Sequence, residues 1–508
     1  MSQNLSKSRY TLFRQCPKAL WMSVYQPNDA IIEDANQARF DEGQRVGELA
    51  KSLLGEYYEA TSRKADGSLD IAAMLTLTQQ LMNDSKVQNI CEASFCIDGC
   101  YCAVDILHRE KDGWAIYEVK SSTDNGYSTS PKEVYIQDIS YQRYVLTRCG
   151  INVTGTYLVC LNSNYVLDGE LDPKELFSII DVSDYVEKEY PKVAPLCKQA
   201  ISVLSQVEQP NIDLNVGCKD PYECAFLNYC MQQHSIPSPS VFDLYRLSWK
   251  KKIAYYAAGK ISFDQLISKK LDTGQRIQVK MTLSCNEYID KEGIRKFLKT
   301  IRYPLYHLDF ETVQPVIPIY QGTHPYQQIP FQYSLHIESS QGAKCEHREF
   351  LADANSENPM RELAEQLCRD IPAGECVLVY NDSFEKTRLK EMADAFPDLH
   401  DHLMAIRSNI VDLLVPFRNW CYYTPAMSGS FSIKKVLPAL FPNNPQLDYH
   451  NLTGSVHNGG EAMDIFPRMR NMQGEELAAA RESLLRYCEL DTWSMVVILR
   501  KLYETIKK

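Results

Sequence analysis

The chain has 508 residues, of which 44% are hydrophobic and 23% are charged. This length exceeds what one core accommodates, so about two to four domains are expected. No run of eighteen apolar residues occurs and the N-terminal segment lacks the apolar stretch of a signal peptide, so we expect a cytoplasmic protein without a membrane span. The net charge of −11 argues against a uniformly basic nucleic-acid-binding coat, although acids clustered at metal sites would contribute to this sum.

Cysteine is frequent in the sequence, with 17 residues, an odd number. In a reducing compartment such thiols are expected to be buried or metal-bound rather than paired in disulfides. We therefore treat some of the cysteines as candidate metal ligands.

Two helices are predicted near the N-terminus. Residues 5–24 form the first, and Cys16 stands alone within it. A lone cysteine is usually a small core residue, so Cys16 gains a further role only if distant partners exist. Residues 36–54 form the second helix, with an apolar stripe and with Glu48, which a solvated position explains equally well.

Residues 91–102 are predicted to form strands that contain four cysteines. A turn at Asp98-Gly99 would distribute these thiols over opposite faces, so ordinary packing is favoured over a metal cluster.

Residues 101–122 are predicted to form a β-hairpin, with turn residues at 109–113 between two apolar strands. In a symmetric hairpin Asp105 lies opposite Glu118, and Lys120 shares the face of Glu118 because strand side chains alternate. Two facing carboxylates with an ammonium beside them are suited to bind a Mg²⁺ or Mn²⁺ ion. The alternative is an ordinary solvated strand face.

The aspartate followed by Glu-x-Lys across a hairpin resembles the catalytic core of the PD-(D/E)XK nucleases, specifically their RecB-like branch. The resemblance implies catalytic roles for Asp105, Glu118 and Lys120. It also extends to the helix predicted at 134–146, where Gln137 and Tyr141 match a Q-x-x-x-Y element that braces the site and contacts DNA. Gln142 is an alternative to Gln137. In this family a histidine often stands near the position of Glu48.

Cys218, Cys224 and Cys230 are each separated by five residues. Three thiolates so close in sequence indicate a soft metal or a cluster, and Cys16 is the obvious fourth ligand. The arrangement resembles RecB-like nucleases of the AddB and CRISPR-associated types, which implies a [4Fe-4S] cluster that ties together the two ends of the domain. A structural zinc ion or three buried thiols are the alternatives.

Three domains are predicted from these patterns: an N-terminal nuclease-like domain at 1–235, a helical connector at 236–303 and a C-terminal domain at 304–508. The connector is rich in lysine, for which a solvated basic linker is the simplest interpretation.

The C-terminal domain begins with an apolar strand at 304–312, on which Asp309 and Glu311 share one face. Strands at 331–337 and 377–380, a helix at 359–371 and a long helix at 475–506 are predicted to complete an α/β fold. On the long helix, Tyr487 precedes Asp491 by four residues, about one turn.

This order of strands, helices and acidic residues resembles that of the DEDD exonucleases, which have a ribonuclease-H-like fold. Tyr487 and Asp491 match the motif of their tyrosine-bearing branch. Where the family has its second aspartate, this chain offers Glu385, with Asn381 and Asp382 as alternatives. The resemblance implies that Tyr487 orients a water molecule and that two Mg²⁺ or Mn²⁺ ions about 3.5 to 4 Å apart are held by four carboxylates, namely Asp309, Glu311, Glu385 and Asp491. Asp412, Lys434 and Lys435 are expected at the mouth of this site, where the lysines contact phosphates.

The whole chain resembles a bacterial family that fuses a RecB-like iron-sulfur nuclease domain to a DEDD-type domain. The resemblance implies a metal-dependent exonuclease that acts on ends or single strands, with DNA a more expected partner than RNA. Repair or defence against phages and plasmids, together with other subunits, is the implied setting. The alternatives are a catalytically inactive nucleic-acid-binding or assembly subunit and an RNA-processing exonuclease.

Overall fold

The computed structural model describes residues 4–31, 34–124, 130–267 and 270–507, and at 34–41 it describes the backbone alone. The chain divides into two compact units of mixed α/β structure. Unit 1 comprises Met1–Ile236 and Val316–Tyr326, and unit 2 comprises Pro237–Pro315 and Gln327–Lys508. Within the described ranges, no helix combines the length and the apolar character that a membrane span requires.

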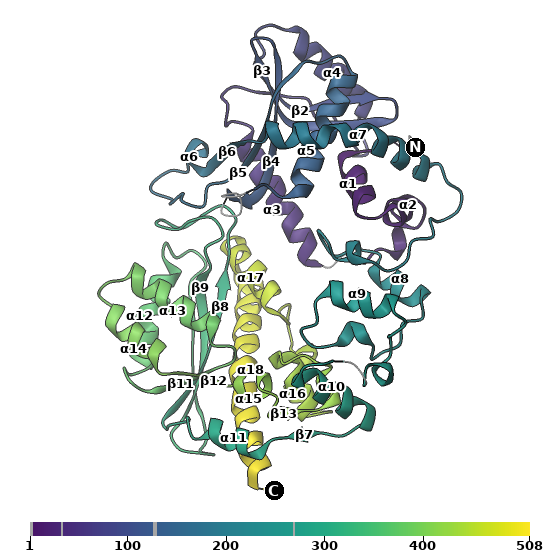
Figure 1. Ribbon diagram of the computed structural model, residues 1–508. Coiled ribbons are helices and arrows are strands. Elements are labelled where there is room, and N and C mark those ends of the chain that lie inside the picture. Colours follow the sequence, from purple (N-terminus) through teal and green to yellow (C-terminus); the bar gives the residue numbers. More distant parts are fainter. Residues whose placement is uncertain (1–3, 32–33, 125–129, 268–269, 508) are drawn as a thin grey trace. The chain divides into compact units, whose positions relative to one another are not determined.

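Unit 1 is built on a six-stranded sheet in the order β1-β2-β3-β4-β5-β6, with helices around it (Figure 1). Strands β2, β3 and β4 are antiparallel, and β5 is parallel to β4. The elements are α1 (Lys7–Gln15), α2 (Pro17–Tyr25), α3 (Asp34–Ala50), β1 (Tyr58–Glu59), α4 (Ile71–Asn83), β2 (Asn89–Ile97), β3 (Cys100–Glu110), β4 (Gly113–Thr123), α5 (Glu133–Arg148), β5 (Val153–Leu161), α6 (Pro173–Leu176), β6 (Phe177–Asp181), α7 (Ser183–Leu204) and α8 (Leu227–Gln233).

The hairpin β3–β4 confirms the prediction from alternation and turn residues, because Lys111 and Asp112 form its turn. Helix α5 connects β4 to the parallel strand β5, as a parallel connection requires. The helix predicted at 5–24 is instead two helices that meet at Cys16, whose extended backbone (φ −160°) ends α1 and begins α2 before Pro17. A proline at the first helical position costs no hydrogen bond, which explains the break.

Unit 2 is built on a five-stranded sheet in the order β10-β9-β8-β11-β12 (Figure 1). Strands β10, β9 and β8 are antiparallel, whereas β8, β11 and β12 are parallel. The elements are α9 (Trp249–Ala257), α10 (Thr273–Ser284), β7 (Tyr288–Ile289), α11 (Lys291–Leu298), β8 (Leu305–Val313), β9 (Ile329–Glu338), β10 (Glu346–Leu351), α12 (Pro359–Asp370), β11 (Cys376–Val379), α13 (Ser383–Ala395), α14 (His400–Ser408), β12 (Ile410–Asp412), α15 (Val415–Arg418), β13 (Tyr422–Tyr423), α16 (Ile433–Leu440), α17 (Gly459–Arg468) and α18 (Gly474–Lys507).

Helix α18 packs against β8 and β9 along its central turns. Its buried residues recur at helical spacing, among them Leu484, Cys488, Asp491 and Met495. Strand β9 is buried along its whole length because α18 covers one side of the sheet and α12 contacts the strand as well. The sheet and α18 therefore fix the strand-borne and helix-borne acids relative to one another.

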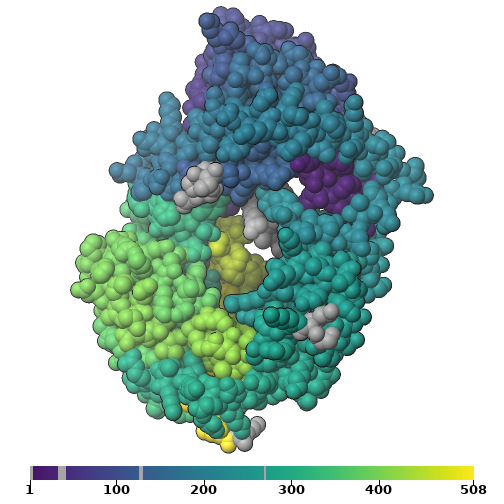
Figure 2. All heavy atoms as spheres, in the orientation of Figure 1, coloured from purple at the N-terminus to yellow at the C-terminus, as the bar shows by residue number. Residues whose placement is uncertain are grey.

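The lysine-rich segment expected as a separate connector belongs to unit 2. Helix α10 packs so closely on the ring of Trp420 that a Cβ at Gly274 would lie 2.2 Å from the indole nitrogen. Tyr245 packs edge-on against the same ring at 5.2 Å. In Figure 2 the teal residues of this segment lie directly against yellow-green residues of the same unit. Residues 316–326, in turn, belong to unit 1, where the backbone N–H of Leu167 donates to the carbonyl of Thr323.

Candidate metal centres

The hairpin of unit 1 brings Asp105 and Glu118 together. Ile106 pairs with Tyr117 across the two strands, which places Asp105 beside Glu118. The backbone N–H of Val119 donates to Asp105 at 2.8 Å and fixes that carboxylate. Glu118 is almost completely buried, with 1% of its side chain exposed.

Two ammonium groups contact these carboxylates. Lys120 lies 2.5 Å from Glu118 and 2.8 Å from Asp138 of α5. Lys7 of α1, which the sequence analysis did not single out, lies 3.3 Å from Asp105 and 3.1 Å from Glu118. Lys7 therefore bridges the two carboxylates that were predicted to share a divalent ion.

The two carboxylates differ in their electrostatic state. Burial and the nearby Glu118 raise the pKa of Asp105 to about 6. Burial also acts to raise the pKa of Glu118, but Lys120 and Lys7 outweigh it and lower that pKa below its usual range. Glu118 is thus held as an anion, whereas Asp105 gains a proton as the pH falls through about 6.

Helix α5 presents Gln142, not Gln137, to the carboxylates. The side-chain amide of Gln142 donates to Glu118 at 2.7 Å, and its neighbour one turn earlier is Asp138. Gln137 bonds to Glu133 at 2.9 Å at the surface. Gln137 and Tyr141 are four residues apart on α5, but the side chains of this helix that contact Lys120 and Glu118 are those of Asp138 and Gln142.

Tyr141 is fully buried away from the carboxylates. Its hydroxyl donates to the carbonyl of Leu5 and accepts from the N–H of Tyr101, and its ring stacks on Tyr10 at 4.7 Å. In this position Tyr141 anchors the residues before α1. It does not contact the predicted catalytic groups.

Two further glutamates of unit 1 differ in their distance from the hairpin carboxylates. Glu48 is exposed, and its carboxylate pairs with Lys51 at 2.7 Å and not with a residue of the hairpin. Glu92 of β2, which the sequence analysis missed, lies in register opposite Asp105, between the pairs Cys91–Ile106 and Ala93–Val104. Burial and Asp105 raise the pKa of Glu92 to about 7.

The four predicted cluster cysteines line one small pocket. Cys16 stands between α1 and α2, Cys218 lies in a short 3₁₀ turn, Cys224 follows in a loop and Cys230 is on α8. All 17 cysteines are free thiols. The chain thus brings one thiol from its first helices to three thiols about two hundred residues later.

Four thiols that share one pocket suit a soft metal. A tetrahedral zinc ion binds four thiolates with bonds of about 2.3 Å, and a [4Fe-4S] cluster binds one thiolate at each iron. The cysteine group fits either of these.

Unit 2 gathers a second group of carboxylates between β8 and α18. Asp309 and Glu311 project from β8, and one ligand atom from each lies within 4.8 Å of the other and of the Cys488 thiol on α18. Asp491, one turn further along α18, accepts a hydrogen bond from Tyr449 at 2.5 Å. Tyr487 lies beside Tyr449, with ring centroids 6.0 Å apart.

These carboxylates lack a close counter-cation among the described residues. Burial, together with Asp491 and Glu311, raises the pKa of Asp309 well above its usual value. Burial, with Asp491 beside it, raises the pKa of Glu311 to about 8, and burial raises that of Asp491 to about 6. Lys434 lies 5.1 Å from the ring centre of Tyr487 and offsets this effect only partly. A group of buried acids in this state fits divalent cations.

Of the residues considered for the second motif, Glu385 is the one placed to contribute. It is 2% exposed, one of its carboxylate oxygens has no hydrogen-bond partner, and it raises the pKa of Asp309. Asp382 is paired with Lys386 at 2.5 Å, and the backbone N–H of Asn381 donates to Asp412.

The residues expected at the mouth of this site differ in their roles. Asp412 accepts hydrogen bonds from two backbone amides and pairs with Arg418 at 3.1 Å, so it holds the loop after β11. Lys434 is exposed and reaches over the rings of Tyr449 and Tyr487. Lys435 is exposed.

The fold and the sites define a mixed α/β protein with a buried carboxylate group in each unit and a cysteine group in unit 1. Residues 306–432 match the family model described as a domain of unknown function (DUF2779). This match includes Asp309, Glu311 and Glu385 and ends before α18.

Three bacterial relatives are similar to the chain. An uncharacterized protein of Mycoplasma genitalium is 23% identical over 467 residues, covering 80% of this chain and 69% of that protein. Its homologue in Mycoplasma pneumoniae is 22% identical over 460 residues, covering 78% and 68%. An uncharacterized Ureaplasma parvum protein is 27% identical over 227 residues, covering 40% and 32%. No solved structure matches the chain.

Replacing Lys7 by methionine tests whether its ammonium occupies the cation position of unit 1. Without divalent ions, Lys7→Met is expected to destabilise the unit by about 1 to 3 kcal/mol, less than for a fully buried pair because Lys7 is 22% exposed. Mn²⁺ should then raise the melting temperature of Lys7→Met more than that of the wild type. Lys51→Met, which removes a lysine paired with Glu48 and Glu59, is the control. Equal Mn²⁺ shifts in all three proteins would contradict the interpretation.

The raised carboxylate pKa values of unit 2 predict how its stability depends on pH. Glu311 has a pKa of about 8 in the folded state against an ordinary value of 4.5, so the folded state retains a proton that the unfolded state releases. Stability without metal should therefore fall as pH rises from about 5 to 8, by up to about 1.4 kcal/mol per pH unit for each proton. Denaturant unfolding in a chelator measures this slope, which Glu311→Gln should reduce and the exposed control Glu482→Gln should not. A stability that rises with pH and is unaffected by Glu311→Gln would refute the assignment.

Proposed function

We propose that this protein is a metal-dependent nuclease with two centres. In this proposal unit 1 is a RecB-like PD-(D/E)XK nuclease domain with a [4Fe-4S] cluster, and unit 2 is a DEDD exonuclease-like domain with a ribonuclease-H-like fold. The observation that carries the proposal is the set formed by the buried Glu118 and Gln142 with the partly buried Asp105 and Lys120. The separate mixed sheets of the two units support assigning one nuclease fold to each.

In unit 1, Asp105 and Glu118 would hold a Mg²⁺ or Mn²⁺ ion. When bound, the ion supplies Lewis-acid stabilisation and lowers the pKa of a water molecule. Burial acts to lower the pKa of Lys120, but Asp138 and Glu118 outweigh it and raise that pKa, so the side chain stays cationic. Its ammonium is positioned to stabilise negative charge that develops on a phosphate.

Gln142 supports this arrangement. Its amide donates to the Glu118 oxygen that also lies nearest Lys7, and so fixes the direction of that carboxylate. The carboxylate of Asp138 lies 2.8 Å from the ammonium of Lys120, which also contacts Glu118. The reacting groups are thereby set in place before a substrate arrives.

In unit 2, the four acids Asp309, Glu311, Glu385 and Asp491 would hold the ions of a two-metal site, which stabilise the attacking and leaving oxygens of a phosphodiester. Tyr487 lies one turn before Asp491 on α18 and is positioned to orient water. Tyr449 donates to Asp491 and holds that carboxylate in place.

A basic pocket of unit 2 supports a nucleic-acid substrate. Arg246, Lys251, Lys260 and Lys270 line it together with Asp272. Arg246 also lines a second pocket with the aromatic rings of Tyr245, Tyr380 and Phe431. Clustered cations and aromatic rings suit a single strand, whose phosphates and bases they contact. We propose DNA in preference to RNA as this substrate.

One observation favours a second candidate function, a catalytically inactive nucleic-acid-binding subunit. Lys7 already provides a positive charge between Asp105 and Glu118, at the position a divalent ion would take. If this ammonium is permanent, unit 1 is neutralised and does not cleave.

A nuclease assay on the full chain separates these functions. With Mn²⁺ or Mg²⁺, the wild type should degrade end-labelled single-stranded DNA. Glu118→Gln should lower the rate of DNA cleavage by unit 1, and Asp309→Asn that of cleavage by unit 2, each by at least about 100-fold. Losses of this size follow when a charge-stabilising group is removed. Gln142→Ala should lower the rate of unit 1, whereas Gln137→Ala, its matched control at the surface, should not.

The substrate class and the inactive alternative are decided in the same assay. RNA of the same sequence, labelled at either end, reports the preferred polymer and the polarity. DNA binding without cleavage in either metal, with Glu118→Gln and Asp309→Asn indistinguishable from the wild type, would refute the nuclease proposal and leave the binding subunit.

The cysteine centre has its own test. Protein purified without oxygen should be brown and contain about four iron and four sulfide per chain. Cys230→Ser should lose the colour and destabilise unit 1, because cluster binding contributes to folding. Cys285→Ser, at an exposed cysteine, should change neither property. A colourless protein that carries zinc would contradict a cluster.

A further inference from the structure

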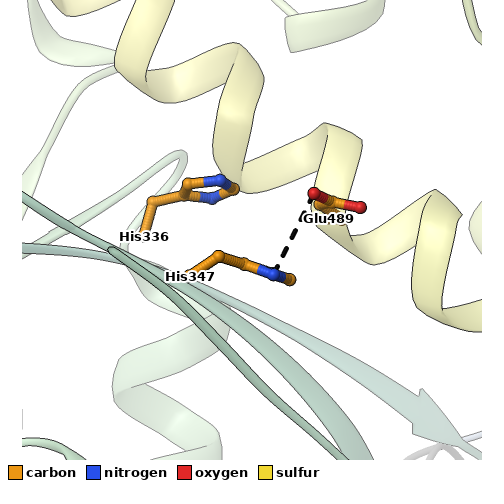
Figure 3. A group of neighbouring side chains, drawn as sticks. All are labelled: His336, His347 and Glu489. Carbon is orange, nitrogen blue, oxygen red and sulfur yellow. Dashed lines mark ion pairs between the residues drawn. The ribbon is translucent and has the colours of Figure 1, made fainter. Parts of the chain in front are cut away.

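Two histidines and a glutamate form a third group of potential ligands in unit 2, apart from the carboxylates described above. His336 of β9 and His347 of β10 are directly paired across the two strands. Their rings project from the sheet toward Glu489 on α18 (Figure 3). Sheet pairing and helix packing thus bring together three residues separated by up to about 150 positions in the sequence.

The geometry of this histidine-glutamate group is close to that of a metal site. One ligand atom from each residue lies within 4.8 Å of the other two. The ring of His347 lies 4.0 Å from the Glu489 carboxylate, and the two imidazole rings are 4.6 Å apart. A tetrahedral ion with bonds of about 2.0 Å needs ligand atoms about 3.3 Å apart. Glu489 is half exposed, so its side chain is free to close the remaining gap.

A hydroxyl group of α18 or β9 contacts one nitrogen of each imidazole ring. The hydroxyl of Thr492 lies 2.8 Å from Nδ1 of His336, and that of Ser334 lies 3.0 Å from Nε2 of His347. The two hydroxyls are themselves 2.7 Å apart. These contacts engage one nitrogen of each ring and leave the opposite nitrogen for an ion. Metal-binding histidines are typically oriented by such a partner on the second nitrogen.

The chemistry of the group selects a class of ion. Two imidazoles and one carboxylate suit zinc and other divalent transition metals, whereas Mg²⁺ and Ca²⁺ prefer oxygen ligands alone.

We propose that His336, His347 and Glu489 bind a divalent transition-metal ion such as Zn²⁺. Solvent completes the coordination at the exposed side of Glu489. The inference does not depend on the proposed nuclease function. The ion joins α18 to strands β9 and β10. Since Glu489 stands between Cys488 and Asp491, the same ion fixes the part of α18 that carries the acid of the neighbouring carboxylate group.

Zn²⁺ binding to the full chain tests this site. Calorimetry should show that Glu489→Gln and His347→Gln each lose one equivalent of Zn²⁺, or bind it at least about 10-fold more weakly than the wild type. Glu482→Gln on the same helix and His450→Gln at an exposed position are the matched controls and should bind like the wild type. Zinc bound by the cysteines or by Asp309 is common to all five proteins and cancels in the comparison.

Cobalt substitution gives an independent readout. Co²⁺ bound by nitrogen and oxygen ligands in a tetrahedral site absorbs in the visible region without the thiolate bands of a cysteine site. The wild type should show this absorption and Glu489→Gln should lack it, with unchanged far-ultraviolet circular dichroism to show that the variant folds. Equal zinc stoichiometry, affinity and cobalt spectra in the wild type and both ligand variants would overturn the proposal, as would an equal loss in the controls.

Discussion

The structure depends on how buried negative charge is balanced. Each unit places carboxylates on its sheet beneath packed helices, where burial weakens their solvation and where like charges repel. Unit 1 balances its acids with two ammonium groups, Lys7 and Lys120, which keep Glu118 ionised. In unit 2 the ammonium of Lys434 lies over aromatic rings, and the pKa values of Asp309 and Glu311 rise instead. The same constraint thus produces an ion-paired site in one unit and a partly protonated site in the other.

This difference changes what a divalent ion encounters in each unit. In unit 2 the ion would displace protons from acids that hold them because they are buried and lie close to one another, so binding is coupled to pH. In unit 1 the ion would compete with a lysine that is tethered to the chain. Metal binding in unit 2 therefore depends on pH, whereas metal binding in unit 1 depends on the position of α1, which carries Lys7. Two sites with similar ligands would thus respond to different changes.

The sequence predicted those features that depend on local patterns. Alternation and turn residues located the hairpin and hence the pairing of Asp105 with Glu118, and helical spacing located α5, α12 and α18. Local patterns did not distinguish Gln142 from Gln137, because the face of α5 that meets the sheet depends on the surrounding helices. Lys7 lies about one hundred residues before Asp105, and the pairing of His336 with His347 depends on strand register. These contacts arise only from the tertiary fold.

Helix α1 contributes to both centres of unit 1, although it has only nine residues. It carries Lys7 at its first turn and ends at Cys16, so one rigid element of nine residues spans the hairpin acids and the cysteine pocket. Deleting residues 7–16 would remove a counter-charge and a thiol together. A shortened chain would therefore lose both centres of unit 1 at once, and truncation is a poor way to assign a role to either of them.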